Sequence, residues 1–419
     1  MNPAGIEIDS FLRLGYFIDF AKVLRPIDFS RVERASLAFL PREELIALGI
    51  VKLQETFASL VVPGARHAVP LSGGLDSRLI LGALLEHFPA ASLHTFTYGV
   101  PGTYDFEIGC DIAKHAGTRH AAIPIDKHTY HEDELIDAAR RTQCQALLFH
   151  LPPLGHLTRL YGDATIWSGY VGDAVAGSHL HEPPSQTLVQ AQRVHLTNRT
   201  FVRSVRLHRC TDADLLSRMG GGTMDPAVVT WDEQVLFSEA VGKFTAPLVL
   251  FEGFRWLTPF INTPWMDFMF SVPDRFRQHQ NLMIDLCCQA FPKLFSLGSK
   301  NRLGHRFDTP NAVVRATFWV NRVRKVAHQF VPWIDWPNAQ YNDFNEGIRS
   351  SRDLREVVRR SVSDLKRRGV CDWVDFDGLW RRHDWRVRNH GDALVTLASL
   401  ELILKARELE ASGPPRGGA

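Results

Sequence analysis

Residues 72–77, Ser-Gly-Gly-Leu-Asp-Ser, combine residue types that bind phosphate groups and metal ions. The paired glycines let the backbone approach an anion closely, and the two serines bring hydroxyls beside the free N–H groups of a new helix. Asp76 would repel bound phosphates unless a divalent cation lay between them. We therefore interpret Asp76 as a Mg²⁺ ligand in a phosphate-binding loop.

An ordinary strand-to-helix turn is the alternative, because glycines and serine caps are common in such turns. The loop also lacks the Gly-Lys-Ser/Thr ending of a Walker A loop. It is therefore not a Walker A loop, whose lysine serves transfer of the γ-phosphoryl group.

The loop belongs to a regular alternation of short apolar strands and helices. We expect strands at 68–71, 92–98, 120–125 and 164–168, and helices at 77–87, 105–116 and within 131–161. This order predicts an α/β fold with a doubly wound parallel sheet. Nucleotides bind at the carboxyl ends of such strands, where both the loop and Thr97-Tyr98-Gly99 are expected.

The composition is that of an ordinary globular protein: 419 residues, 45% of them hydrophobic, with a formal net charge of +2. A balance this close to zero gives no reason to expect nucleic acid or a membrane as a partner. Neither a signal peptide nor a run of about 18 apolar residues is evident, so we expect a cytoplasmic protein. No Cys-x-x-Cys spacing occurs, which predicts reduced thiols and no zinc site.

The loop resembles that of the N-type ATP pyrophosphatases, among them asparagine synthetase, GMP synthetase and NAD synthetase. After the strand at 164–168, the chain shares Ser168, Gly169, Asp173 and Gly177 with a second signature of asparagine synthetases. Weaker similarities follow as far as residue 304. The resemblance to the asparagine synthetase family spans roughly residues 10–310 and narrows the choice to that family.

This resemblance implies a site that binds ATP and Mg²⁺ and adenylates a carboxylate, which ammonia or an amine then attacks to form an amide. Asp76 and Asp173 would share the Mg²⁺, and Lys300, placed like the family's late lysine, would stabilise the transition states. A solvated surface lysine is the alternative for Lys300. The residues predicted to bind the nucleotide are Leu71, Ser72, Gly73, Gly74, Asp76, Ser77, Thr97, Tyr98, Ser168 and Gly169.

Two positions depart from the family pattern. Where asparagine synthetases have glutamates, this chain has Tyr170 and Ala174. A tyrosine at the first position resembles the β-lactam synthetases, so Tyr170 is a candidate general base, with simple packing beside the nucleotide as the alternative. Its partner carboxylate is left open among Glu233, Glu239 and Glu252. Arg78 replaces a serine, and points either to the phosphates or away along the helix.

The expected nitrogen donor also differs from that of the glutamine-dependent family members. Glutamine-dependent members begin with Met-Cys and a glutaminase domain, whereas position 2 here is Asn2 and the loop follows soon after. We expect nitrogen from free ammonia, from a separate glutaminase or pathway partner, or from an amine on the substrate. A specialised amide-forming ligase or cyclase, and a nucleotide-binding pseudoenzyme that serves as a partner subunit, are the alternatives to an asparagine synthetase-like ligase.

We expect a helical lead-in over residues 1–60, the synthetase domain over 61–310, a helical C-terminal region over 311–410 and a disordered tail over 411–419. The C-terminal region is locally basic, yet the apolar positions around 354–365 fall on one helical face. A solvated arginine face is therefore favoured there over a nucleic-acid surface.

Overall fold

The computed structural model describes residues 3–34, 36–330 and 342–412. At its centre is a five-stranded parallel sheet of order β3-β2-β1-β4-β5. Its strands are β1 (His67–Pro70), β2 (His94–Gly99), β3 (Arg119–Pro124), β4 (Thr165–Trp167) and β5 (Arg255–Leu257). The predicted α/β fold is confirmed. The sequence did not predict β5, whose three residues pair with β4 at the edge of the sheet.

The helices between these strands follow the predicted alternation. They are α3 (Asp76–Leu85), α4 (Tyr104–Ala116), α5 (Glu132–Arg141) and α6 (Leu154–Tyr161). Strand β1 pairs with β2 on one side and β4 on the other, so the chain reverses direction across the sheet at β1. The phosphate-binding loop follows β1, the central strand, and β4 ends beside it. Such a reversal opens a crevice at the carboxyl ends of the strands.

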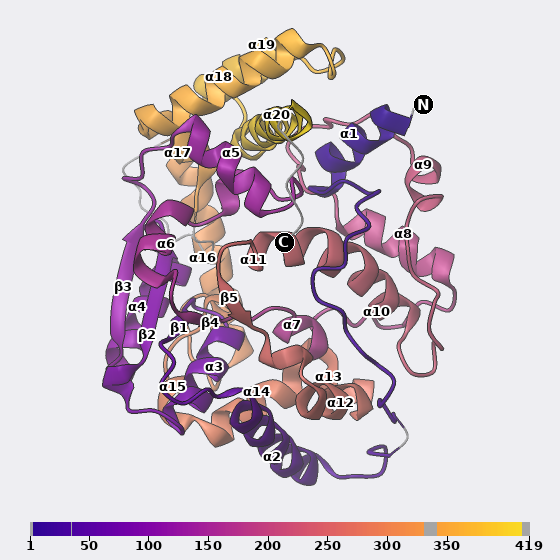
Figure 1. The fold of residues 1–419 in the computed structure, drawn as a ribbon, viewed down its shortest axis with the longest axis vertical. Coiled ribbons are helices and arrows are strands. Elements are labelled where there is room, and N and C mark those ends of the chain that lie inside the picture. Colours follow the sequence, from indigo (N-terminus) through magenta and orange to yellow (C-terminus); the bar gives the residue numbers. More distant parts are fainter. Residues whose placement is uncertain (1–2, 35, 331–341, 413–419) are drawn as a thin grey trace.

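Helices cover both faces of the sheet (Figure 1). One face packs against α2 (Arg42–Leu60), α3, α12 (Thr263–Ser271) and α14 (Asn281–Ala290). The other packs against α5, α6 and α20 (Gly391–Ser412). Two separate hydrophobic cores result, each between the sheet and one helical layer.

The lead-in is helical only at its two ends. Helix α1 (Pro3–Leu14) stops at Gly15, whose φ of 82° is a left-handed conformation that suits glycine. The described residues between there and Pro41 form turns and extended segments before α2 begins. The expectation of a helical lead-in over residues 1–60 was wrong for this middle part.

Short helices connect β4 to β5 and the later half of the chain. They are α7 (Gly172–Val175), α8 (Leu188–Asn198), α9 (Asp212–Leu216), α10 (Trp231–Val235), a π-helix (Leu236–Thr245) and α11 (Ala246–Val249). After β5 come α12, α13 (Asp274–Arg277), α14 and α15 (Pro292–Phe295).

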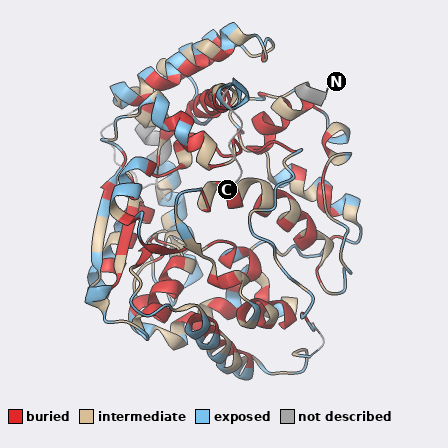
Figure 2. Cartoon of the chain, viewed as in Figure 1, coloured by how far each residue is buried: buried red, intermediate tan, exposed pale blue. Residues whose placement is uncertain are grey.

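The C-terminal region is helical, as predicted: α16 (Asn311–Phe330), α17 (Phe344–Ser350), α18 (Arg352–Arg368), α19 (Phe376–Asp384) and α20. Helix α18 buries Leu354, Val357, Val358, Val362 and Leu365 and turns its charged residues outward, which Figure 2 shows as a buried stripe beside an exposed one.

Apolar residues of α18 and α20 share one core with the sheet. The proposed domain limits at residues 60, 310 and 410 stay a prediction. Of the expected tail, residues 413–419 lie outside the described residues. Within the described part of the chain, no helix is both long enough and apolar enough to cross a membrane.

Candidate active site

The loop between β1 and α3 is folded by its own hydroxyl groups. The Ser72 N–H donates to Ser77 Oγ over 3.2 Å, and the Gly74 N–H donates to Ser72 Oγ over 3.2 Å. The two hydroxyls lie 3.3 Å apart. These contacts fix the loop as a tight turn at the N-terminus of α3, where the free N–H groups of the helix favour a bound anion.

Asp105 fastens this loop to Lys300, and sequence reasoning missed it. Its Oδ1 accepts the Gly73 N–H at 2.8 Å, and its Oδ2 lies 3.0 Å from Lys300 Nζ. The Lys300 N–H in turn donates to the Gly73 carbonyl at 3.0 Å. The only signal was an acidic residue in the first turn of the helix that follows β2, at the same edge of the sheet. Lys300 is therefore held in the site as an ion pair and is not a free surface lysine.

Two aspartates meet at the other side of the loop. Asp76 begins α3, and Asp173 lies on α7 after β4. Burial, and then the charge of Asp173, raise the pKa of Asp76 well above its usual range. Burial would also raise the pKa of Asp173, but hydrogen bonds from His179, the Ala174 N–H and Ser178 outweigh it and lower the pKa.

The side chain of Asp76 leaves no room for a larger residue at Gly172. A Cβ atom there would lie 2.6 Å from Asp76 Cγ. Asp76 Oδ1 is buried and has no hydrogen-bond partner among the residues that the structure describes. A buried carboxylate oxygen without a partner, beside a second carboxylate, fits a bound cation.

The loop, the aspartates and Lys300 line one cavity of about 460 Å³. The sequence-predicted residues that line it are Leu71, Ser72, Gly74, Asp76, Ser77, Tyr98, Ser168, Gly169, Tyr170, Asp173 and Lys300. An apolar wall completes it, formed by Phe96, Leu157, Leu248, Val249, Phe251 and Trp256. The structure thus brings together residues from the ends of β1, β2 and β4 with a lysine from far along the chain.

Two of the predicted nucleotide-binding residues are not among those that line the cavity. The Gly73 N–H donates to Asp105, and the Gly73 carbonyl accepts from the Lys300 N–H. Buried Thr97 donates through Oγ1 to the Leu71 carbonyl at 3.0 Å. Both residues shape the loop through its backbone.

Tyr170 faces the cavity without a carboxylate partner among the described residues. Its backbone N–H donates to Ser168 Oγ, and burial raises the pKa of its phenol. Of the three glutamates considered, Glu239 bonds Tyr16, Lys243 and the Gly220 N–H, and Glu252 bonds Gln143. Neither makes a hydrogen bond to the tyrosine, so the role of Tyr170 as a base stays a prediction.

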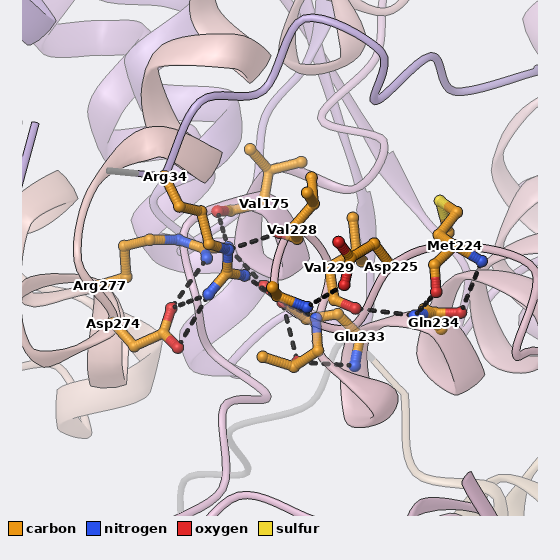
Figure 3. Close-up of polar contacts among 12 residues, drawn as sticks. Arg34, Val175, Met224, Asp225, Val228, Val229, Glu233, Gln234, Asp274 and Arg277 are labelled. Carbon is orange, nitrogen blue, oxygen red and sulfur yellow. Dashed lines mark hydrogen bonds and ion pairs between the residues drawn. The ribbon is translucent and has the colours of Figure 1, made fainter. Parts of the chain in front are cut away.

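The third candidate, Glu233, belongs to a buried network of charged groups (Figure 3). Its two oxygens lie 2.8 Å from Arg277 Nη2 and 2.6 Å from Arg34 Nη2. Both guanidinium groups also bond Asp274, and Arg277 donates to the Val175 carbonyl at 2.9 Å. Because Val175 ends α7, this network anchors the short helix that presents Asp173.

Arg78 points away from the phosphate-binding side of the loop. Its fully buried guanidinium donates to the carbonyls of Leu297 at 3.2 Å and Gly298 at 2.6 Å, and lies over the rings of Phe295 and Phe307. The second of the two predicted directions is therefore the observed one. Arg78 holds the segment that leads directly to Lys300.

Comparison with known proteins agrees with this geometry. The asparagine synthase family model matches residues 52–217, a stretch that contains the loop, Asp105, Tyr170 and Asp173. Residues 52–217 form an asparagine synthase domain. Lys300 lies beyond the matched stretch of this domain, and its place in the site rests on its contacts with Gly73 and Asp105.

Two plant proteins are similar to parts of this chain. Asparagine synthetase [glutamine-hydrolyzing] 3 of Arabidopsis thaliana is 26% identical over 157 residues, which are 32% of this chain and 26% of the relative. Asparagine synthetase [glutamine-hydrolyzing] 2 of the same plant is 35% identical over 80 residues, or 16% of this chain and 14% of the relative. The chain thus matches about a quarter or less of the length of these relatives, and at family level the domain supports a ligase.

Proposed function

We propose that this protein is an ATP-dependent amide-forming ligase. It adenylates a carboxylate with release of pyrophosphate, and it transfers the acyl group from AMP to ammonia or an amine. The observation that carries the proposal is the convergence of the anion-binding loop, Asp76, Asp173 and Lys300 on one cavity. That set of groups matches the charges of a polyphosphate and of the pentacovalent phosphorus formed during attack.

Asp76 and Asp173 are the residues that would hold Mg²⁺. Two carboxylates together with phosphate oxygens are the usual protein setting for this ion, and the unpartnered Asp76 Oδ1 agrees with it. Among the described residues, no group of three or more His, Cys, Asp or Glu side chains is placed to hold a metal. A metal here would therefore take its other ligands from the nucleotide and water. When bound, Mg²⁺ would neutralise charge on the pyrophosphate leaving group.

The protein groups have separable tasks. The free N–H groups at the start of α3 and the serine hydroxyls bind the phosphates, while Leu71, Tyr98 and Gly169 border the adenine and ribose. Lys300 offers its ammonium to the charge that develops at the α-phosphate and later at the acyl group. Asp105 holds that ammonium in position, since its Oδ2 lies 3.0 Å from Lys300 Nζ.

A specialised ligase, in which the substrate carries its own amine, is the second candidate. Tyr170 favours it, because this residue lines the cavity and a phenol could take the proton of an attacking amine. The identities of the acid and the amine follow from neither the loop nor the aspartates.

Product analysis tests the proposal directly. With Mg²⁺, ATP and a panel of carboxylic acids, we expect AMP and pyrophosphate in equal amounts, together with acid-dependent exchange of labelled pyrophosphate into ATP. The loop type is the reason, since it lacks the lysine that a Walker A loop offers to the β- and γ-phosphates. Formation of ADP and phosphate would contradict the whole scheme.

The Tyr170→Phe variant distinguishes the two candidates. If Tyr170 handles the amine proton, the variant should retain pyrophosphate exchange within about twofold and lose amide formation by roughly 10²-fold, the usual scale of general base catalysis. Single-turnover measurements with a trapped adenylate separate these two steps. Efficient asparagine formation from aspartate and ammonia, with Tyr170→Phe equal to wild type, would instead support a plain asparagine synthetase.

A further inference from the structure

We propose that the outer face of α16 docks onto an anionic lipid surface. This inference is independent of the reaction assigned to the cavity. It concerns residues 311–324, the part of the helix whose side chains the structure describes. The overall net charge of +2 gave no reason to expect such a partner, but that sum averages over the distribution of charge along the chain.

The inner face of α16 lies against the protein through a few polar contacts. Thr317 Oγ1 lies 2.8 Å from His305 Nε2, and Asn321 Nδ2 lies 3.4 Å from the Tyr104 hydroxyl. Thr317, Asn321 and Val314 are the half-buried residues of this face. The remaining described residues of the helix are exposed.

The outer face carries an apolar strip. Ala312, Ala316, Trp319 and Val323 recur at spacings of four, three and four residues, which places them on one side of a helix. Trp319 is 60% exposed and Val323 67% exposed. Val320 extends the strip and is also half exposed. A continuous strip of this kind on a surface helix is typical of an interaction site and not of a solvated face.

Positive charge borders this strip on both sides. Arg315 and Arg322 lie seven residues apart along one edge, and Arg324 lies along the other. All three are exposed, and none forms an ion pair with a described residue. The sequence of α16 contains no aspartate or glutamate from 311 to 330. The face therefore presents three cations without an ion-pair partner among the described residues, which matches an anionic surface.

The arrangement fits a lipid headgroup layer. Helices that lie in a membrane interface bury an apolar strip at the acyl boundary, while arginines at its edges extend to lipid phosphates. Trp319 stands at the edge of the strip with the Arg322 guanidinium 5.3 Å from its ring, which places an amphipathic aromatic beside a cation. Such residues gather at the level of the headgroups.

Vesicle flotation of the full chain tests the proposal. We expect binding to vesicles with about 30% phosphatidylglycerol to exceed binding to phosphatidylcholine vesicles by roughly 100-fold, because each arginine near an anionic surface adds about fivefold. The double variant Arg315→Gln/Arg322→Gln should lose most of this difference, and Trp319→Ser should weaken binding to both vesicles. About 0.5 M NaCl should remove the preference for the anionic lipid.

The matched control is Trp385→Ser at the end of α19, since Trp385 is 73% exposed but lies on another surface. It should bind like wild type. Equal binding to both vesicle types would overturn the proposal, as would wild-type binding by the arginine variant. A wild-type dimer that Trp319→Ser converts to a monomer, without lipid binding, would assign the strip to a second copy of the chain and would also overturn it.

Discussion

Replacing either aspartate by asparagine should reduce acid-dependent pyrophosphate exchange by roughly 10³-fold while the protein remains folded. Each variant, Asp76→Asn and Asp173→Asn, keeps the size of the side chain and removes the charge that would hold Mg²⁺. The loss of several kcal/mol of charge stabilisation at the leaving group corresponds to a factor of this order. Stability should not fall for Asp76→Asn, because burial already disfavours the charged form of that residue.

Thermal unfolding supplies a readout that does not depend on turnover. Mg²⁺ with a non-hydrolysable ATP analogue should raise the Tm of the wild type and leave the Tm of both variants nearly unchanged. Asp163→Asn is a matched control, since Asp163 is an exposed aspartate that pairs with Arg66 away from the cavity. Near-normal exchange by Asp76→Asn or Asp173→Asn would show that the metal ligands are assigned wrongly.

The sheet could be predicted from sequence because each of its first four strands is bounded by helices and turns that the chain itself encodes. Strand β5 could not. Its three residues are defined by pairing with β4, and nothing in the local pattern around Trp256 distinguishes it from a loop. The extended stretch before α2 could not be predicted for the same reason. Its conformation depends on distant groups such as Glu233 and Asp274, which bind Arg34.

Part of the candidate site could likewise be predicted from sequence, and part could not. Asp76 follows β1 and Asp173 follows β4, two parallel strands that pair directly, so a parallel sheet with both residues at its carboxyl edge brings them close. Asp105 and Lys300 are 195 residues apart, and no spacing rule relates them. The direction of Arg78 was open for the same reason, because its acceptors are carbonyl groups on a segment more than 200 residues away. Partners joined only by the tertiary fold have no local signature.

Truncation of Glu233 should be the most destabilising single change in the buried network. Glu233→Ala leaves Arg277 buried at 0% exposure without its main counter-ion, and breaking one half of such a pair costs about 3–5 kcal/mol of unfolding free energy. Glu356→Ala is the control, because Glu356 and Arg360 are both about 60% exposed and such pairs contribute about 0.5 kcal/mol or less. Urea unfolding at pH 7 compares the two variants. A loss below about 1 kcal/mol for Glu233→Ala would contradict the structural role given to the network.

The pH dependence of that loss identifies its electrostatic part. Burial would raise the pKa of Glu233, but the charges of Arg277 and Arg34 outweigh it and lower the pKa below its usual value of 4.5. A carboxylate with a lowered pKa in the folded state contributes stability above its unfolded pKa, and this contribution is lost as the pH falls through the folded pKa. The difference in unfolding free energy between wild type and Glu233→Gln should therefore be largest near neutral pH and shrink below pH 4.5.

The double variant Glu233→Met/Arg277→Met should recover part of the stability lost in Glu233→Ala, because it removes the unpaired buried charge. If the double variant is instead less stable than Glu233→Ala, the bonds from Arg277 to Val175 and Asp274, and not the ion pair with Glu233, hold α7 in place.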